Sequence, residues 1–124
     1  MTVDNPMANR LASLFAAIDA QDTEGFLAFL SPDAVFRFGS ASPLRGHDAI
    51  RDGVNGFFAS IAESRHELSN VLGDDATVVC EGEVTYRRRD GSELTLPFTN
   101  IFELTDELVS HYKIYIDINP LYAS

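Results

Sequence analysis

The spacing of apolar residues changes once along this chain, near residue 65. Before that point apolar residues recur every three or four positions, as at Leu11, Leu14 and Ile18, and this spacing is typical of one face of a helix. Beyond it, β-branched and aromatic residues alternate with polar ones, which is typical of strands. Helices followed by strands predict an α+β fold.

The first half of the chain predicts three helices and one short strand. These elements are a helix that begins at Pro6 with Asn5 as its N-cap, helices Thr23–Leu30 and His47–Ala62, and a strand Ala34–Phe38. Gly53 and Gly56 lie inside the third helix, where each weakens it by roughly 1 kcal/mol relative to alanine. Close packing is the one reason for them that the sequence offers.

The second half predicts four strands joined by short turns. They are Arg65–Leu72, Thr77–Arg88, Glu93–Leu104 and Leu108–Ile118. Short connections favour the pairing of consecutive strands, so we expect an antiparallel meander.

The last predicted strand has two faces of opposite character, because successive side chains of a strand point to opposite sides. The apolar face carries Tyr112, Ile114, Ile116 and Ile118. The polar, titratable face carries His111, Lys113, Tyr115 and Asp117. Such a polar row on a central strand either meets solvent or lines a pocket.

Composition and charge exclude several classes of protein. A chain of 124 residues fits one domain, and a formal charge of −10 argues against a nucleic-acid surface, which needs basic stripes. The single cysteine, Cys80, excludes an internal disulfide and a multi-cysteine metal site. It suits a reducing cytosol, so we expect a cytoplasmic protein. We expect neither a signal peptide nor a membrane helix, since no apolar stretch approaches ~20 residues.

Four segments carry a resemblance to the nuclear transport factor 2-like superfamily and its SnoaL-like members, which include polyketide cyclases and ketosteroid isomerase-like proteins. They are Leu30–Phe36 (LSPDAVF), Pro43–Arg51 (PLRGHDAIR), Leu96–Phe102 (LPFTNIF) and Tyr112–Leu121. The resemblance covers nearly the whole chain and implies a cystatin-like roll. In this fold a curved antiparallel sheet forms a cone around three N-terminal helices.

The resemblance also implies a pocket and a partner. One sheet face lines a deep pocket for a small hydrophobic ligand, and the other often meets a second subunit. The alignment places His111, Lys113, Tyr115 and Asp117 toward the pocket. It turns Ile114, Ile116 and Ile118 outward. We therefore expect a homodimer through the outer sheet face.

Known chemistries of the superfamily match only in part. The ketosteroid isomerase positions hold Leu14, Phe38 and Asn100, so that enzyme's general base is missing. The Arg-x-Asp pair of limonene-epoxide hydrolases falls near Gly82 and Val84 and is also missing. Asp117 matches the terminal aspartate of those hydrolases and the pocket carboxylate of SnoaL-like cyclases.

The resemblance implies a candidate site on these positions. Asp117 is an acid/base candidate, with Tyr115, Asn100 and His66 as polar partners, or else it caps the segment that begins at Asn119, and the two interpretations carry equal weight. The ligand-binding candidates are Leu14, Phe38, Phe57, Tyr86, Phe98, Phe102, His111 and Lys113. Nothing suggests a metal or a cofactor.

Two functions follow from this reasoning. The first is a cofactor-independent isomerase, cyclase or hydrolase that acts on a hydrophobic carbonyl or epoxide compound. The second is a non-catalytic binding protein for a small apolar metabolite. The polar row on the last strand favours the first function, and the missing base favours the second.

Overall fold

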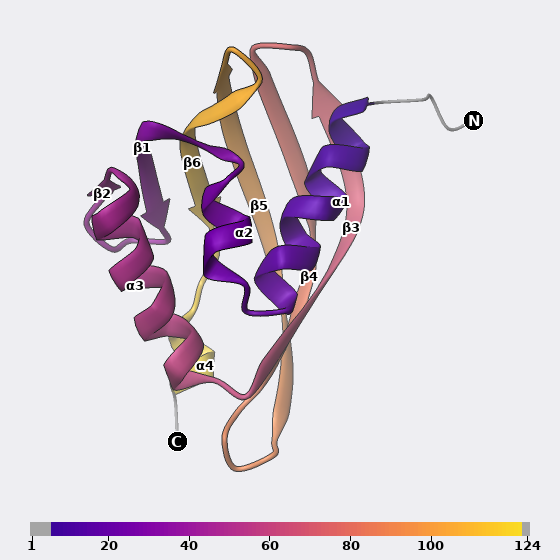
Figure 1. Cartoon of the computed structure of the whole chain (residues 1–124). Coiled ribbons are helices and arrows are strands. Elements are labelled where there is room, and N and C mark those ends of the chain that lie inside the picture. Colours follow the sequence, from indigo (N-terminus) through magenta and orange to yellow (C-terminus); the bar gives the residue numbers. More distant parts are fainter. Residues whose placement is uncertain (1–5, 123–124) are drawn as a thin grey trace.

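The computed structural model describes residues 6–122 and shows helices packed against a curved sheet (Figure 1). The helices are α1 (Pro6–Asp19), α2 (Thr23–Leu27), α3 (His47–Ser60) and α4 (Asn119–Tyr122). The strands are β1 (Leu30–Phe38), β2 (Leu44–Arg45), β3 (Glu63–Gly73), β4 (Thr77–Arg87), β5 (Glu93–Thr105) and β6 (Leu108–Tyr115). The predicted α+β class is confirmed. Asn5, the predicted N-cap, lies outside the described residues.

The strands of residues 6–122 form one sheet in the order β2-β1-β6-β5-β4-β3. The meander from β3 to β6 is antiparallel, as the short turns predict. However, β1 lies parallel to β6, with Phe36 opposite Tyr112 and Phe38 opposite Ile114. The sheet is therefore mixed and not purely antiparallel. A parallel pair needs a long connection, and here the whole of α3 and the meander separate β1 from β6 in the chain.

Several element boundaries differ from the prediction. The second helix ends at Leu27, because Leu30 already pairs with Val109 as the start of β1. The predicted loop after β1 contains the two-residue strand β2. The last strand stops at Tyr115, and the short helix α4 follows, which the sequence did not predict.

The core lies between the helices and the inner face of the sheet, the face that carries Phe36, Phe98 and Tyr112. Aromatic rings dominate its centre, where the Phe102 and Tyr112 rings have centroids 4.4 Å apart. Leu14 of α1 is buried in the same cluster. The concave sheet thus gains its stability from helices that cover one face only.

The C-terminal segment is held to the end of the β4–β5 hairpin by arginine. Arg88 donates a hydrogen bond from Nε to the carbonyl oxygen of Leu121 at 3.0 Å. It donates another from a terminal nitrogen to the carbonyl oxygen of Pro120 at 2.8 Å.

Within residues 6–122, no helix is long and apolar enough to cross a membrane.

Gly82 provides a test of the register between β3 and β4. A Cβ at this position would overlap the carbonyl oxygen of Glu67 and the Cα of Leu68, beside an irregularity in the pairing. Because backbone atoms cannot move aside cheaply, Gly82→Ala should lower the free energy of unfolding by about 1–3 kcal/mol. Urea denaturation measures this change.

The matched control is Gly56→Ala on α3, where an added Cβ meets nothing within 4 Å. That variant should gain roughly 0.5–1 kcal/mol, because alanine favours the helix. Equal unfolding midpoints for the two variants would contradict the β3–β4 register described above.

Candidate functional site

A cavity of about 300 Å³ lies between the helices and the inner face of the sheet. Phenylalanine, tyrosine, isoleucine, leucine and valine side chains make up most of its wall. Its lining comprises Ile18, Phe26, Phe36, Phe38, Ala41, Ser42, Leu44, Gly53, Val54, Phe57, Phe58, Ser64, His66, Val84, Tyr86, Phe98, Asn100, Tyr112, Ile114 and Ile116. An apolar cavity with a few polar groups is typical of a small-molecule site.

The last strand faces the cavity with its apolar side, which is the reverse of the predicted orientation. Tyr112, Ile114 and Ile116 line the cavity, whereas His111 and Lys113 lie on the outer face. The Lys113 ammonium forms an ion pair there with Glu103 at 2.9 Å. Tyr115 is 56% exposed. The physical reason is hydrophobic burial, because the helices cover the apolar face within the same chain.

Asp117 is exposed and belongs to the chain turn after β6. Its carboxylate accepts a hydrogen bond from the backbone N–H of Asn119 at 3.1 Å. Of the two interpretations, the structure supports the cap at the start of α4, and it contradicts an acid/base role inside the cavity.

The isoleucines that were predicted to form a dimer interface lie on the inner side of the sheet instead. Ile114 and Ile116 line the cavity, and Ile118 packs against the core. These isoleucines are therefore not free to form a sheet-on-sheet contact. A homodimer through other residues of the outer face stays a prediction.

The structure does bring most other predicted site residues together. His66, Asn100, Phe38, Phe57, Tyr86 and Phe98 all line the cavity. Leu14 and Phe102 are instead fully buried in the core beside it. They support the wall and do not form its surface.

The sequence analysis missed Asp19, the last residue of α1. Its Oδ1 atom lies 2.6 Å from Nδ1 of His66 and accepts a hydrogen bond from the Ser64 hydroxyl at 2.9 Å. Its Oδ2 atom accepts the backbone N–H of His66 at 2.9 Å. Three hydrogen bonds from β3 therefore hold one carboxylate at the edge of the cavity.

The bonds to Asp19 determine its charge. Burial by itself raises the pKa of the Asp19 carboxyl, but the hydrogen bonds and charge of His66 and the hydrogen bond from Ser64 outweigh burial and hold the pKa below its usual range. An ionised carboxylate accepts hydrogen bonds and donates none. Nδ1 of His66 is therefore the donor, and Nε2 is the nitrogen available to a ligand.

Aromatic rings fix the plane of the His66 imidazole. Phe15 stacks on it with centroids 4.8 Å apart, and Phe98 meets it edge-on at 5.4 Å. One signal for Asp19 was present in the sequence, because Leu11, Phe15 and Asp19 follow one another at intervals of four on a helix. A carboxylate on the buried stripe of an amphipathic helix requires a partner.

A second polar group, the amide of Asn100, lies in the cavity wall. Its Nδ2 atom donates to the Tyr112 hydroxyl at 3.4 Å, and its Oδ1 atom has no hydrogen-bond partner among residues 6–122. Burial raises the pKa of Tyr112 far above its ordinary value. Burial also raises the pKa of Tyr86, so both phenols stay neutral and able to donate.

Among the described residues, no group of three or more His, Cys, Asp or Glu side chains is arranged to hold a metal ion. The cavity wall therefore carries His66, which is bonded to Asp19 behind it, and neutral hydrogen-bonding groups. Such a site is suited to proton transfer on an uncharged ligand.

Comparison with solved structures shows the same architecture in several proteins. A putative SnoaL-like polyketide cyclase from Jannaschia sp. CCS1 is similar over 98% of this chain and 95% of its own, with a TM-score of 0.81 and 17% identity. TerC, solved with polyporic acid, is similar over 95% of this chain and 96% of its own, with a TM-score of 0.82 and 18% identity.

A third similar structure is an LEH-like epoxide hydrolase from M. tuberculosis. The similarity extends over 92% of this chain and 84% of the hydrolase chain, with a TM-score of 0.76 and 16% identity. At these identities the likeness concerns the fold alone. No curated protein matches the sequence. The SnoaL-like domain family matches residues 11–112, and the chain therefore belongs to this family within the nuclear transport factor 2-like superfamily.

Proposed function

We propose that this protein is a cofactor-independent acid/base catalyst, an isomerase or cyclase, that acts on a small hydrophobic carbonyl compound. The observation that carries the proposal is the bond between Asp19 and His66 in the wall of an apolar cavity. We further propose that the protein works in the cytosol, where a thiol such as that of the buried Cys80 stays reduced.

In the proposed reaction His66 takes the role that the sequence analysis gave to Asp117. Nε2 of His66 removes a proton from the carbon next to the ligand carbonyl, and the electron pair moves into an enolate. Where the ligand has a carbon–carbon double bond beside that carbon, the enolate extends over it as a dienolate. The same nitrogen then returns the proton to the far carbon of that bond, and the double bond shifts into conjugation with the carbonyl, which completes an isomerisation. Asp19 holds the imidazole in the required tautomer and stabilises the charge that it gains.

Hydrophobic walls favour this chemistry for two reasons. They exclude water that would compete for the proton, and they strengthen the interaction between the imidazole and the Asp19 carboxylate. Tyr86 and Asn100 lie in the same wall and are available to donate hydrogen bonds to a ligand oxygen.

A non-catalytic binding protein is the second candidate. The observation in its favour is that Phe38 lines the cavity, and the resemblance aligns Phe38 with the base of ketosteroid isomerases. In this alternative the Asp19–His66 pair only ties α1 to β3. The epoxide hydrolase alternative loses its support, because Asp117 does not reach the cavity.

A hydrogen-exchange experiment separates catalysis from binding. β-Tetralone, a bicyclic ketone with acidic C–H bonds, should exchange these hydrogens in D₂O faster with the protein than in buffer, as followed by NMR. His66→Gln should slow the protein-dependent exchange by roughly 10²–10⁴-fold, because it removes a positioned base. The control is His111→Gln on the outer face, which should leave the rate unchanged.

Binding of the ketone without accelerated exchange would favour the binding protein. Exchange that depends on His111 and not on His66 would contradict the proposed assignment.

The Asp19 carboxylate should also govern stability in acid. Its pKa in the folded chain lies below that of the unfolded chain, so its contribution is complete above about pH 3.9 and is lost as the pH falls through the lower, folded-state pKa. At pH 7, Asp19→Asn should cost about 1–3 kcal/mol, because it weakens three hydrogen bonds. Urea denaturation at several pH values measures both effects.

Asp52→Asn is the control, since it removes the same charge from an exposed position of α3. The difference in free energy of unfolding between Asp19→Asn and wild type should shrink in strong acid. The Asp52→Asn variant should have the wild-type free energy of unfolding at every pH. A constant difference at all pH values would contradict an ionised, bonded Asp19.

A further inference from the structure

The exposed lining residues of the cavity belong to two segments, which indicates where the cavity meets solvent. Among its lining residues, Ala41, Ser42 and Gly53 are exposed, and all others are buried or half-buried. Two of them belong to the loop between β1 and β2, and the third belongs to α3. The opening therefore lies between residues 39–43 and α3, and the smallest side chains of the lining surround it.

Leu44 of β2 lies over Gly53 at this opening. A Cβ at position 53 would lie 2.5 Å from Cδ1 of Leu44, which is too close for two carbon atoms, and 3.9 Å from its Cγ. Both residues line the cavity, and Leu44 is half-buried. The absence of a side chain at Gly53 therefore makes room for the tip of Leu44.

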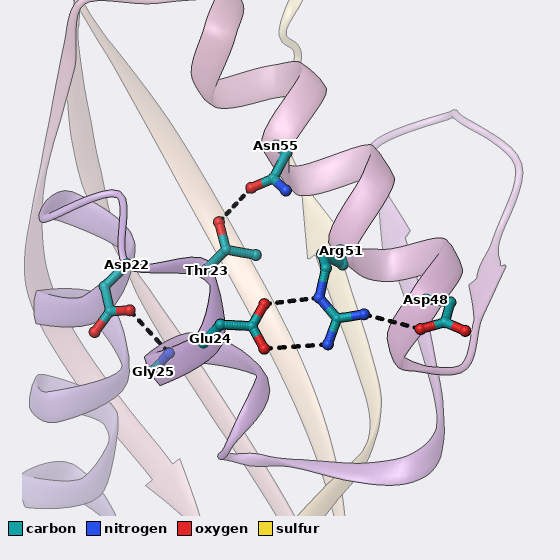
Figure 2. Close-up of polar contacts among 7 residues, drawn as sticks. All are labelled: Asp22, Thr23, Glu24, Gly25, Asp48, Arg51 and Asn55. Carbon is teal, nitrogen blue, oxygen red and sulfur yellow. Dashed lines mark hydrogen bonds and ion pairs between the residues drawn. The ribbon is translucent and has the colours of Figure 1, made fainter.

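Polar contacts hold the other side of the helix to α2 and oppose a shift of the helix that would relieve that contact (Figure 2). Arg51 donates to Glu24 from Nε at 2.7 Å and from a terminal nitrogen at 3.1 Å, and it also pairs with Asp48 at 2.8 Å. The Thr23 hydroxyl donates to the amide oxygen of Asn55 at 2.5 Å. Residues 51 and 55 share one face of the helix, and residue 53 lies on the opposite face.

A larger side chain at position 53 must therefore displace Leu44, and the hydrophobic effect determines the direction. Outward movement would expose the isobutyl group to water, which the hydrophobic effect disfavours. Inward movement places it against Phe57 and Phe38, which line the same cavity. Displacement thus narrows the path to the cavity.

We propose that Leu44 and Gly53 form the gate of the cavity and set the width of the ligand that enters between residues 39–43 and α3. This inference rests on the ligand-binding part of the proposed function and is independent of proton transfer by His66. The gate also gives a reason for Gly53, which weakens α3 and for which the sequence alone suggests only close packing.

Stopped-flow fluorescence with prodan tests the gate. Prodan is an uncharged naphthalene ketone whose emission rises in apolar surroundings, so its association rate can be followed directly. Gly53→Ala should slow association about tenfold. The matched control is Gly56→Ala, which makes the same change three residues along the helix in open space and should leave the rate unchanged.

The double variant Gly53→Ala with Leu44→Ala completes the test. It should restore the wild-type rate or exceed it, because the side chain that blocks the path is shortened. Equal rates for the Gly53 and Gly56 variants would overturn the gate, as would slow association that persists in the double variant. Failure of wild-type protein and every variant to bind prodan would instead overturn the ligand-binding function, and the gate with it. Thermal melting of each variant checks that it is folded.

Discussion

Burial of the apolar side of β6 is the constraint on which the rest of the structure depends. Tyr112 and Ile114 of β6, together with Ile116 just after it, have to leave water, and the helices are the part of the chain that covers them. Because successive side chains of a strand point to opposite faces, burial of the apolar side puts His111, Lys113 and Tyr115 on the outer face. The titratable pair at the edge of the cavity comes instead from α1 and β3, as Asp19 and His66.

The sequence predicts the fold well, because periodicity and short turns report local structure and pairing of consecutive strands. Helices at residues 6–19 and 47–60 and the four-stranded meander are where the pattern places them. The parallel pairing of β1 with β6 is a long-range contact, and no local pattern reports it. The sequence around Asp117 is typical of a strand, because Ile116 and Ile118 continue the alternation of apolar and polar residues. In the structure the Asp117 carboxylate instead accepts a hydrogen bond from the backbone N–H of Asn119, in the turn that follows β6.

The site is less predictable, because it depends on which residues from distant elements meet. His66, Asn100 and Tyr86 were found because the resemblance places their strands around a pocket. The polar row of β6 was misplaced, because a dimer partner was expected to cover the apolar face. The partner of His66 was missed entirely, although Asp19 continues the buried stripe of α1 that begins at Leu11. A carboxylate on such a stripe indicates a buried hydrogen-bond donor nearby.

The position of a bound ligand is the most direct test, and intermolecular NOEs between an unlabelled ligand and uniformly ¹³C-labelled protein measure it. With β-tetralone bound, we expect NOEs to the methyl groups of Ile114 and Ile116 and to the ring protons of His66, which all line the cavity. NOEs to Tyr115 and Lys113 of the outer face, without any to these isoleucines, would contradict a ligand site in the cavity.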